Sequence, residues 1–233
     1  MTSNQTVYYI PSKSAVIGLI GAMLGIERDN SSTEIYGSQY IDFYAVTRIG
    51  IRFETIPKKV TFYTNHRILK KKGERLKIKP FKKELLVEPI YTIFVGTKED
   101  RFNKLVDIIE NKNFVYSPYL GHAYCPAVID DLKVYDNVKS IQESEDEKTS
   151  CVVLDESETY NKDNFEFRLS PIDKDSKVMI ERHLHHFIKN HVLEKTVLKH
   201  WIPIKSSFRI AIDSARELSS FVKMDDEEIV CLY

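Results

Sequence analysis

The segment from Lys58 to Lys83, KKVTFYTNHRILKKKGERLKIKPFKK, constrains the fold of this chain more than any other. Eleven lysines or arginines and a single acidic residue, Glu74, lie within it. Its two halves alternate in part between apolar and polar residues, and they flank the polar sequence KKGE. This pattern is typical of two extended strands joined by a turn, so the segment predicts a long basic β-hairpin.

The charge of this segment stands out because the chain as a whole is neutral, with 34 basic and 34 acidic residues. The balancing acidic residues gather mainly at 142–148, 155–166 and 223–228. Exposed lysines also protect strands from aggregation, which is a purely structural explanation. The density of cations exceeds that need, however, and a concentrated basic segment in a neutral protein favours a polyanionic partner, with nucleic acid as the leading class.

The composition predicts a soluble globular protein of the cytoplasm. With 233 residues, of which 42% are hydrophobic, the chain is long enough to bury a full core. Its longest apolar run, 15–26, is too short to span a bilayer. Cys125, Cys151 and Cys231 lie far apart without a CxxC motif, so neither a disulfide framework nor a zinc site is indicated. We therefore expect no metal and no cofactor.

A helix is predicted over 12–26, although it contains three glycines, at positions 18, 21 and 25. They fall within one arc of the helix surface, which predicts close packing of this helix on a sheet. The start of the helix also allows a ligand site, because Ser12 is a good N-cap and Lys13 and Ser14 follow it. Free amides at a helix N-terminus attract phosphate, so both interpretations stand together.

Residues 39–53 alternate well enough to predict a strand. One face would carry the apolar residues, namely Ile41, Phe43, Ala45, Ile49, Ile51 and Phe53. The other would carry Tyr40, Tyr44, Arg48 and Arg52, a mixture that suits base stacking and phosphate pairing but also an ordinary solvent-exposed face.

Further elements are predicted as a strand at 88–96, an amphipathic helix at 98–112 and a strand at 126–138. The resulting order is helix, strand, hairpin, strand, helix, strand. One additional strand before the first helix would complete the βαββαβ plan of ferredoxin-like folds, which RNA-recognition domains share.

Three stretches in this order resemble the Cas-five family of CRISPR-associated proteins. They are YYIPSKSAVIGLIGAMLG at 8–25, KKELLVEPIYTIFVG at 82–96 and SPYLGHAYCPAVI at 117–129. Together they cover most of residues 5–138, and the pattern of insertions looks most like type I-B members. The resemblance implies an α+β chain: a ferredoxin-like (RRM-like) RNA-binding domain over 1–138, with a thumb hairpin at 54–88, and a variable portion over 139–233 with an acidic loop and then mixed α/β structure.

The resemblance also implies a function in antiviral defence. Members are non-catalytic RNA-binding subunits of the type I surveillance complex Cascade, where they hold the five-prime handle of the CRISPR RNA. The expected partners are this handle, the backbone filament subunit and the large subunit, with no membrane. By carry-over the helix start, the thumb and the loop at 119–122 contact the handle. Together with the basic residues of the predicted strand at 39–53, the candidate RNA-binding residues are Lys13, Ser14, Arg48, Arg52, His66, Arg67, Lys70, Lys71, Lys72, Arg75, Lys77, Tyr119, Gly121 and His122.

The sequence departs from the family at its start. Members open with a hydrophobic strand before the first helix, whereas only QTVYYI precedes Pro11 here. The first strand of the ferredoxin-like plan is therefore expected to be missing. The C-terminal residues 227–233, EEIVCLY, are a candidate to pair in the sheet instead.

Two alternative chemistries remain. Some family members are metal-independent endoribonucleases that process precursor CRISPR RNA, for which His66 or His122 would act with Tyr119 and nearby lysines. A lone loop histidine beside basic residues is more often an RNA contact, so we expect no catalysis. The second is metal binding by His183, His185, His186 and His191, of which His183 and His186 would share a helical face. This spacing matches no HExxH pattern, which favours a structural or RNA-facing role.

Overall fold

The computed structural model describes residues 4–27, 38–55, 57–68, 77–122, 124–141, 144–149, 152–155, 167–171, 177–189, 192–204, 208–212, 220–224 and 229–233. The chain divides into two compact units. The hairpin unit comprises Met1–Ile10 and Phe53–Thr92, and the large unit comprises Pro11–Arg52 and Ile93–Tyr233. Together they form an α+β protein with few helices and several sheets.

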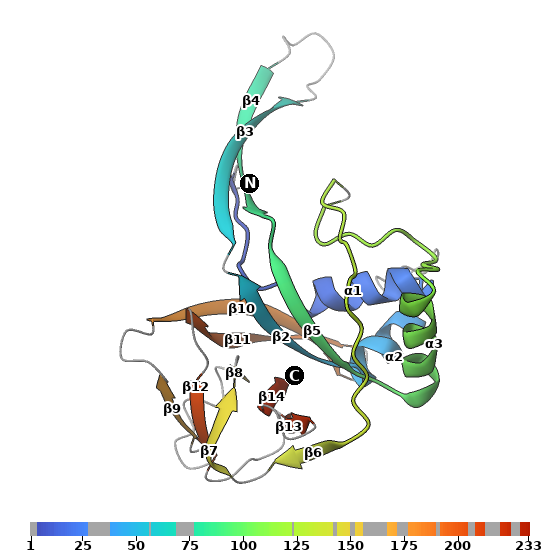
Figure 1. Ribbon diagram of the computed structural model, residues 1–233. Helices are drawn as coiled ribbons and strands as arrows, with labels where there is room; N and C mark the ends of the chain where they lie inside the picture. Colours follow the sequence, from blue (N-terminus) through green and yellow to red (C-terminus); the bar gives the residue numbers. More distant parts are fainter. Residues whose placement is uncertain are drawn as a thin grey trace. The chain divides into compact units, whose positions relative to one another are not determined.

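The hairpin unit is built on two long antiparallel strands, β3 (Lys58–Ile68) and β4 (Lys77–Val87) (Figure 1). Their register runs without a shift from the pair Lys58 and Val87 to the pair Ile68 and Lys77. A short strand, β1 (Asn4–Gln5), lies parallel to β4, which gives the sheet order β1-β4-β3. The two predicted arms are thus paired strands, while the chain between them, 69–76, lies outside the described residues.

In the large unit the predicted first helix is present as α1 (Lys13–Leu24). The hydroxyl of Ser12 accepts a hydrogen bond of 3.3 Å from the Ala15 amide and so caps the helix. The helix ends at Gly25, whose φ of 74° is a left-handed conformation that favours glycine.

The predicted close packing through the helix glycines is wrong for Gly18 and Gly21, while at Gly25 a Cβ would stand 3.0 Å from Val115 Cγ1. A Cβ placed on Gly18 would meet no described atom within 4 Å, and one on Gly21 would meet only Ile26, at 3.8 Å. The packing contacts of α1 come instead from its large apolar side chains, including Ile17 and Ile20, which are buried. Of the three glycines, only Gly25 has a conformational reason to be glycine.

The predicted strand at 39–53 is also wrong in its first half, which is the helix α2 (Ser38–Val46). The strand β2 (Arg48–Thr55) begins after it. Tyr40, Phe43 and Tyr44 are all buried, a spacing of three and four residues that places them on one side of a helix. The aromatic residues expected on an exposed strand face are therefore part of the core.

The strand expected at 88–96 and the helix expected at 98–112 are present as β5 (Ile90–Gly96) and α3 (Glu99–Glu110). β2 and β5 pair in a two-stranded sheet. Two acidic residues, Glu99 and Asp100, occupy the first turn of α3, where the helix dipole favours them. α1 contacts both α2 and α3, and the three helices lie together in Figure 1.

The strand expected at 126–138 is not formed, because residues 126–137 adopt no regular structure. Val128 is 82% exposed, and Asp131 has a φ of 30°, which interrupts an extended chain. Strand β6 (Val138–Ile141) begins only where this segment ends. Among the described residues the backbone pairing of this segment is limited to its start, an isolated bridge between Pro126 and Tyr119, and an alternating pattern alone does not make a strand without a continued ladder of hydrogen bonds. The described residues thus lack the last strand of the predicted βαββαβ order.

A C-terminal pairing exists, as the sequence suggested for 227–233. Strand β14 (Ile229–Leu232) pairs with β13 (Ser220–Met224), and Tyr233 exchanges two backbone hydrogen bonds, of 3.1 and 3.0 Å, with Ile49 of β2. Gly50 allows this approach, since a Cβ there would stand 2.7 Å from Val230 Cγ1 and 2.9 Å from the Cys231 carbonyl. The C-terminus therefore packs tightly on β2.

The remaining strands complete two sheets of the large unit. One has three strands in the order β10-β11-β8, and the other has six in the order β6-β13-β14-β7-β12-β9. The acidic stretch expected to form a loop contains a strand, β7, which has β14 and β12 as neighbours. The described residues from 139 onward contain only strands among their regular elements. Their bounds are β7 (Ser144–Thr149), β8 (Val152–Asp155), β9 (Phe167–Pro171), β10 (Lys177–Lys189), β11 (Val192–Ile204) and β12 (Phe208–Ile212).

The core of the large unit includes the cluster of Phe94, Val222, Met224 and Val230. Within the described parts of the chain, no helix is both long and apolar enough to cross a membrane.

Candidate nucleic-acid interface

The N-terminal end of α1 brings together three of the predicted residues, Lys13, Ser14 and Arg48. The Lys13 ammonium is mostly buried and lies 5.3 Å from the centroid of the Tyr44 ring. Burial, and secondarily the charge of Arg48, lowers the pKa of Lys13 to about 8. The Ser14 hydroxyl lies 3.0 Å from that of Ser12, and Arg48 is exposed. Two nearby cations and the first amides of a helix form an electropositive surface here.

Arg52 has a different environment from Arg48. Its guanidinium lies 5.5 Å from the ring centroid of Phe94, a member of the core cluster, and the residue is half-buried. The basic and aromatic strand face predicted from Tyr40, Tyr44, Arg48 and Arg52 is not formed, because the two tyrosines lie on α2. Of the four residues, only Arg48 is exposed.

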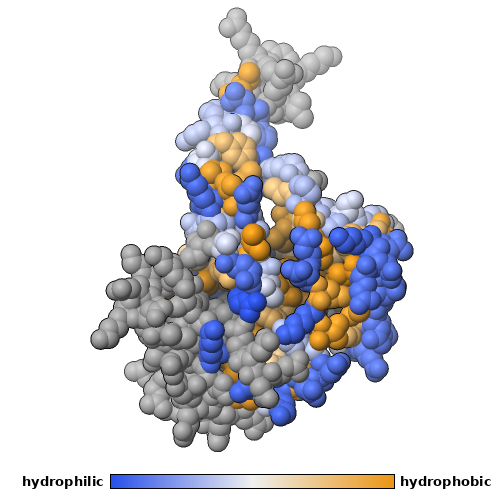
Figure 2. Space-filling model, viewed as in Figure 1, coloured by the Kyte–Doolittle hydropathy of each residue, from blue (hydrophilic) through white to orange (hydrophobic). Residues whose placement is uncertain are grey.

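One face of the hairpin carries cations and aromatic rings. The exposed His66 donates to or accepts from the Thr64 hydroxyl at 3.0 Å, and its ring lies 4.8 Å from that of Phe81. The Lys79 ammonium lies 5.8 Å from the Phe81 centroid. Figure 2 shows hydrophilic and hydrophobic residues side by side on the described part of the hairpin.

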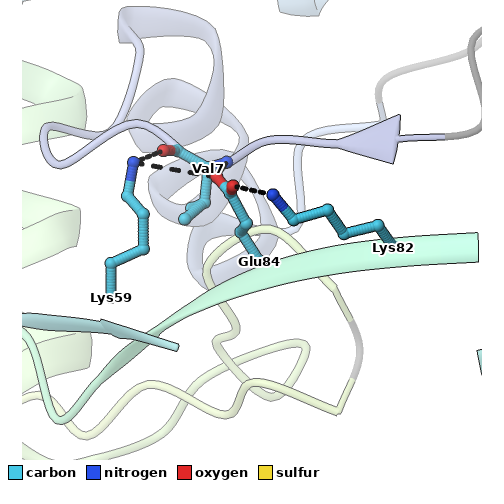
Figure 3. Close-up of polar contacts among 4 residues, drawn as sticks. All are labelled: Val7, Lys59, Lys82 and Glu84. Carbon is cyan, nitrogen blue, oxygen red and sulfur yellow. Dashed lines mark hydrogen bonds and ion pairs between the residues drawn. The ribbon is translucent and has the colours of Figure 1, made fainter. Parts of the chain in front are cut away.

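The opposite face of the hairpin holds the N-terminal segment of the chain (Figure 3). The Glu84 carboxylate lies 3.8 Å from Lys59 Nζ and 3.3 Å from Lys82 Nζ, and it accepts a hydrogen bond of 3.4 Å from the Val7 amide. The Lys59 ammonium donates a hydrogen bond of 2.7 Å to the Val7 carbonyl and lies 4.5 Å from the centroid of the Tyr9 ring. Burial raises the pKa of Glu84, but the hydrogen bonds from Lys82 and Val7 and the two lysine charges outweigh it and hold that pKa below its usual value.

The other predicted hairpin residues are only partly described. Arg67 and Lys77 lie in β3 and β4, where their backbones pair with Ile78 and Ile68. The remaining four, Lys70, Lys71, Lys72 and Arg75, lie outside the described residues.

The predicted loop contacts Tyr119, Gly121 and His122 lie together in a closed turn. The Leu120 amide donates a hydrogen bond of 3.1 Å to the Cys125 carbonyl, and the Cys125 amide donates one of 2.8 Å to the His122 carbonyl. Gly121 has a φ of 89°, which favours glycine. The exposed rings of His122 and Tyr124 stack 4.9 Å apart at 9°.

Tyr124 is the residue of this loop that sequence reasoning missed. Its position two residues after His122, in the same loop, is the sequence feature that could have identified it. Stacked exposed rings of this kind suit contact with nucleic-acid bases.

The segment that precedes this loop is anchored at the C-terminal end of α1. The Val115 and Tyr116 amides donate to the carbonyls of Met23 and Ala22, at 3.1 and 3.2 Å, in the last turn of α1. The segment that leads into the loop is therefore fixed to the C-terminal end of α1.

The histidine cluster does not have the geometry expected of it. Residues 183–186 lie in strand β10, so His183 and His186 do not share a helical face. His183 is buried, and its ring lies 4.4 Å from that of His200 and its Nε2 3.3 Å from Glu181. Within the described part of the chain no group of three or more His, Cys, Asp or Glu side chains is arranged to hold a metal ion. His191 lies outside the described residues.

Comparison with known sequence families shows to which family this chain belongs. Residues 1–216 match the family described as CRISPR-associated protein (Cas_Cas5). The chain belongs to this family. The resemblance to Cas-five proteins is thereby confirmed, while the type I-B subtype stays a prediction.

Two further comparisons add less. No curated protein matches the chain. A solved structure titled "CRISPR RNA-guided surveillance complex" is similar to it at 14% sequence identity with a TM-score of 0.49, over 89% of this chain and 84% of that one.

Proposed function

We propose that this CRISPR-associated protein is the non-catalytic subunit that holds the five-prime handle of the CRISPR RNA in a type I surveillance complex, Cascade. The observation that carries the proposal is the hairpin in a member of this family. Its described side chains, 58–66 and 78–87, include five lysines and one acid, Glu84. Such a surface attracts the phosphates of an RNA strand.

The proposal includes the domain plan implied by the family. A ferredoxin-like RNA-binding portion over 1–138 would use the hairpin as a thumb, with a more variable portion over 139–233. The loop at 119–124 and the cations at Lys13 and Arg48 would supply additional contacts to the handle. The backbone filament subunit and the large subunit would be the protein partners, in the cytoplasm.

Co-purification tests this function. The tagged chain, expressed in cells that carry the matching CRISPR array and companion genes, is expected to bring down other subunits and a discrete repeat-derived RNA. Recovery of the folded chain alone, without RNA, would contradict the proposal.

We also propose that the chain does not cleave RNA. Supporting this, the two histidines considered as catalysts each have a local structural partner, Thr64 for His66 and the Tyr124 ring for His122. Purified protein is incubated with repeat RNA, with and without a chelator, and no discrete product is expected. A single cut that disappears in His66→Ala or His122→Ala would establish an endoribonuclease instead.

A further inference from the structure

The two faces of the hairpin differ in charge. In an antiparallel pair, residues directly opposite each other share a face, and so do residues two apart along a strand. The uninterrupted register therefore sorts the described side chains into two sets. We define the lysine face as Lys58, Val60, Phe62, Thr64, His66, Lys79, Phe81, Lys83, Leu85 and Val87, and the glutamate face as Lys59, Thr61, Tyr63, Asn65, Ile78, Pro80, Lys82, Glu84 and Leu86.

The lysine face has no acidic residue among these described side chains, but three lysines. Lys79 and Lys83 are four residues apart on β4, and Lys58 lies opposite Val87, four residues further on. At about 3.4 Å per residue, the cations recur roughly every 14 Å along the hairpin. Phe81 lies between the first two, and Phe62 lies opposite Lys83. This alternation of cations and aromatic rings is typical of surfaces that follow single-stranded nucleic acid.

The glutamate face is covered in part by the chain itself, near Lys59 and Glu84, whereas Tyr63 on the same face is 69% exposed. Glu84 balances the charge of Lys59 and Lys82, at 3.8 and 3.3 Å. The backbone of Val7 is bonded through both its amide and its carbonyl to side chains of this face. A strand of RNA that followed this face as far as Lys59 and Glu84 would have to displace the N-terminal segment and disrupt the Glu84 ion pairs.

From this difference we infer that the RNA strand lies along the lysine face of the hairpin, with bases stacked at Phe81 and His66 and phosphates at Lys79 and Lys83. This inference rests on the proposed RNA-binding function and assigns it to one of two faces. The glutamate face instead holds the N-terminal segment.

The chain offers a matched test, because Lys82 and Lys83 are neighbours on β4 that face opposite ways. Binding of a fluorescein-labelled oligouridine to the full chain is measured at several salt concentrations for Lys83→Ala and Lys82→Ala. Loss of one phosphate contact is expected to flatten the slope of log affinity against log salt by about 0.7 for Lys83→Ala. Little change is expected for Lys82→Ala, whose lysine pairs with Glu84.

A second matched pair tests stacking independently of charge. Phe81→Leu on the lysine face is expected to weaken binding roughly fivefold or more, as loss of a base-stacking ring does. Tyr63→Leu, which removes an exposed ring from the glutamate face, is expected to leave affinity within about twofold. Thermal melts of all variants check folding, and Lys83→Arg, which keeps the charge, is expected to retain the salt slope.

The possible outcomes distinguish failure of the face assignment from failure of the proposed RNA-binding function. Equal effects of Lys82→Ala and Lys83→Ala, or a larger effect of Tyr63→Leu than of Phe81→Leu, would overturn the face assignment while RNA binding stands. A wild-type chain that binds no oligouridine would overturn the inference as well. In that case the co-purification experiment decides whether the proposed function itself fails.

Discussion

The cations at the start of α1 and those of the lysine face are both candidates for RNA contact, yet they differ in environment. Lys13 is mostly buried against Tyr44, and its pKa is lowered to about 8. Lys58 and Lys79 are exposed on a hairpin without nearby described acids on their face. A buried cation is costly to the fold and sensitive to pH, whereas exposed cations respond mainly to salt. RNA contact at Lys13 should therefore weaken as the pH rises, whereas RNA contact at the lysine face should weaken as the salt concentration rises.

The largest expected effect comes from removing the buried cation. Lys13→Met is expected to weaken RNA binding about tenfold, since a charge-assisted contact at a desolvated site is lost. The same change is expected to raise the melting temperature, because the desolvation cost of the ammonium disappears. Affinity measurements and thermal melts check both effects. Lys58→Met is the exposed control, expected to weaken binding less and to leave the melting temperature unchanged; the reverse ranking would contradict the comparison.

A smaller effect is expected from pH. Because Lys13 loses its proton around pH 8, RNA affinity is expected to fall between pH 7 and pH 9, by no more than Lys13→Met lowers it. Between pH 8 and 10.5 the unfolded lysine binds a proton that the native one has lost, so stability is expected to rise with pH relative to Lys13→Met.

Lys13→Arg is the control for this pH dependence, since arginine keeps its charge throughout that range. Affinity curves of the wild type and of this variant that decline in parallel would show that Lys13 is not the titrating contact.

The smallest expected effect concerns the glutamate face. Glu84→Gln is expected to speed hydrogen exchange at the Val7 amide without weakening RNA binding, because it loosens only the N-terminal segment. In the wild type the lowered pKa of Glu84 makes its stabilising contribution complete at neutral pH, and this contribution is lost as pH falls below 4.5 toward the lowered value. An unchanged exchange rate at Val7, or a large loss of RNA affinity, would break the proposed division between the two faces.

The elements that the sequence predicted well are those with strong local patterns. The hairpin strands, β5 and α3 follow from periodicity, and α1 also from its capping residue, Ser12. Residues 39–46 were misread because Tyr40 and Tyr44 fit a spacing of two as well as a spacing of four. Residues 126–137 alternate like a strand, but among the described residues their pairing does not extend beyond an isolated bridge between Pro126 and Tyr119.

The candidate site was predictable to a similar extent. Lys13 and the loop at 119–122 were predicted from motifs, whereas Arg48 was predicted from a strand face that is not formed. Contacts between distant parts of the chain could not be predicted from the sequence. They include the hydrogen bonds of Tyr233 with Ile49 and of Val7 with Glu84, and the division of the hairpin lysines between two faces, which depends on strand register. A pattern of charges along a strand does not reveal which of them the rest of the chain will neutralise.

The most direct test of the account is cross-linking of RNA to this chain in its native complex. The complex is irradiated with ultraviolet light, digested and analysed by mass spectrometry for peptides that carry nucleotides. Cross-links are predicted at Phe81 and His66 on the lysine face, and at His122 or Tyr124 in the loop. Cross-links confined to Tyr63 on the glutamate face, or absent from the hairpin altogether, would contradict the account.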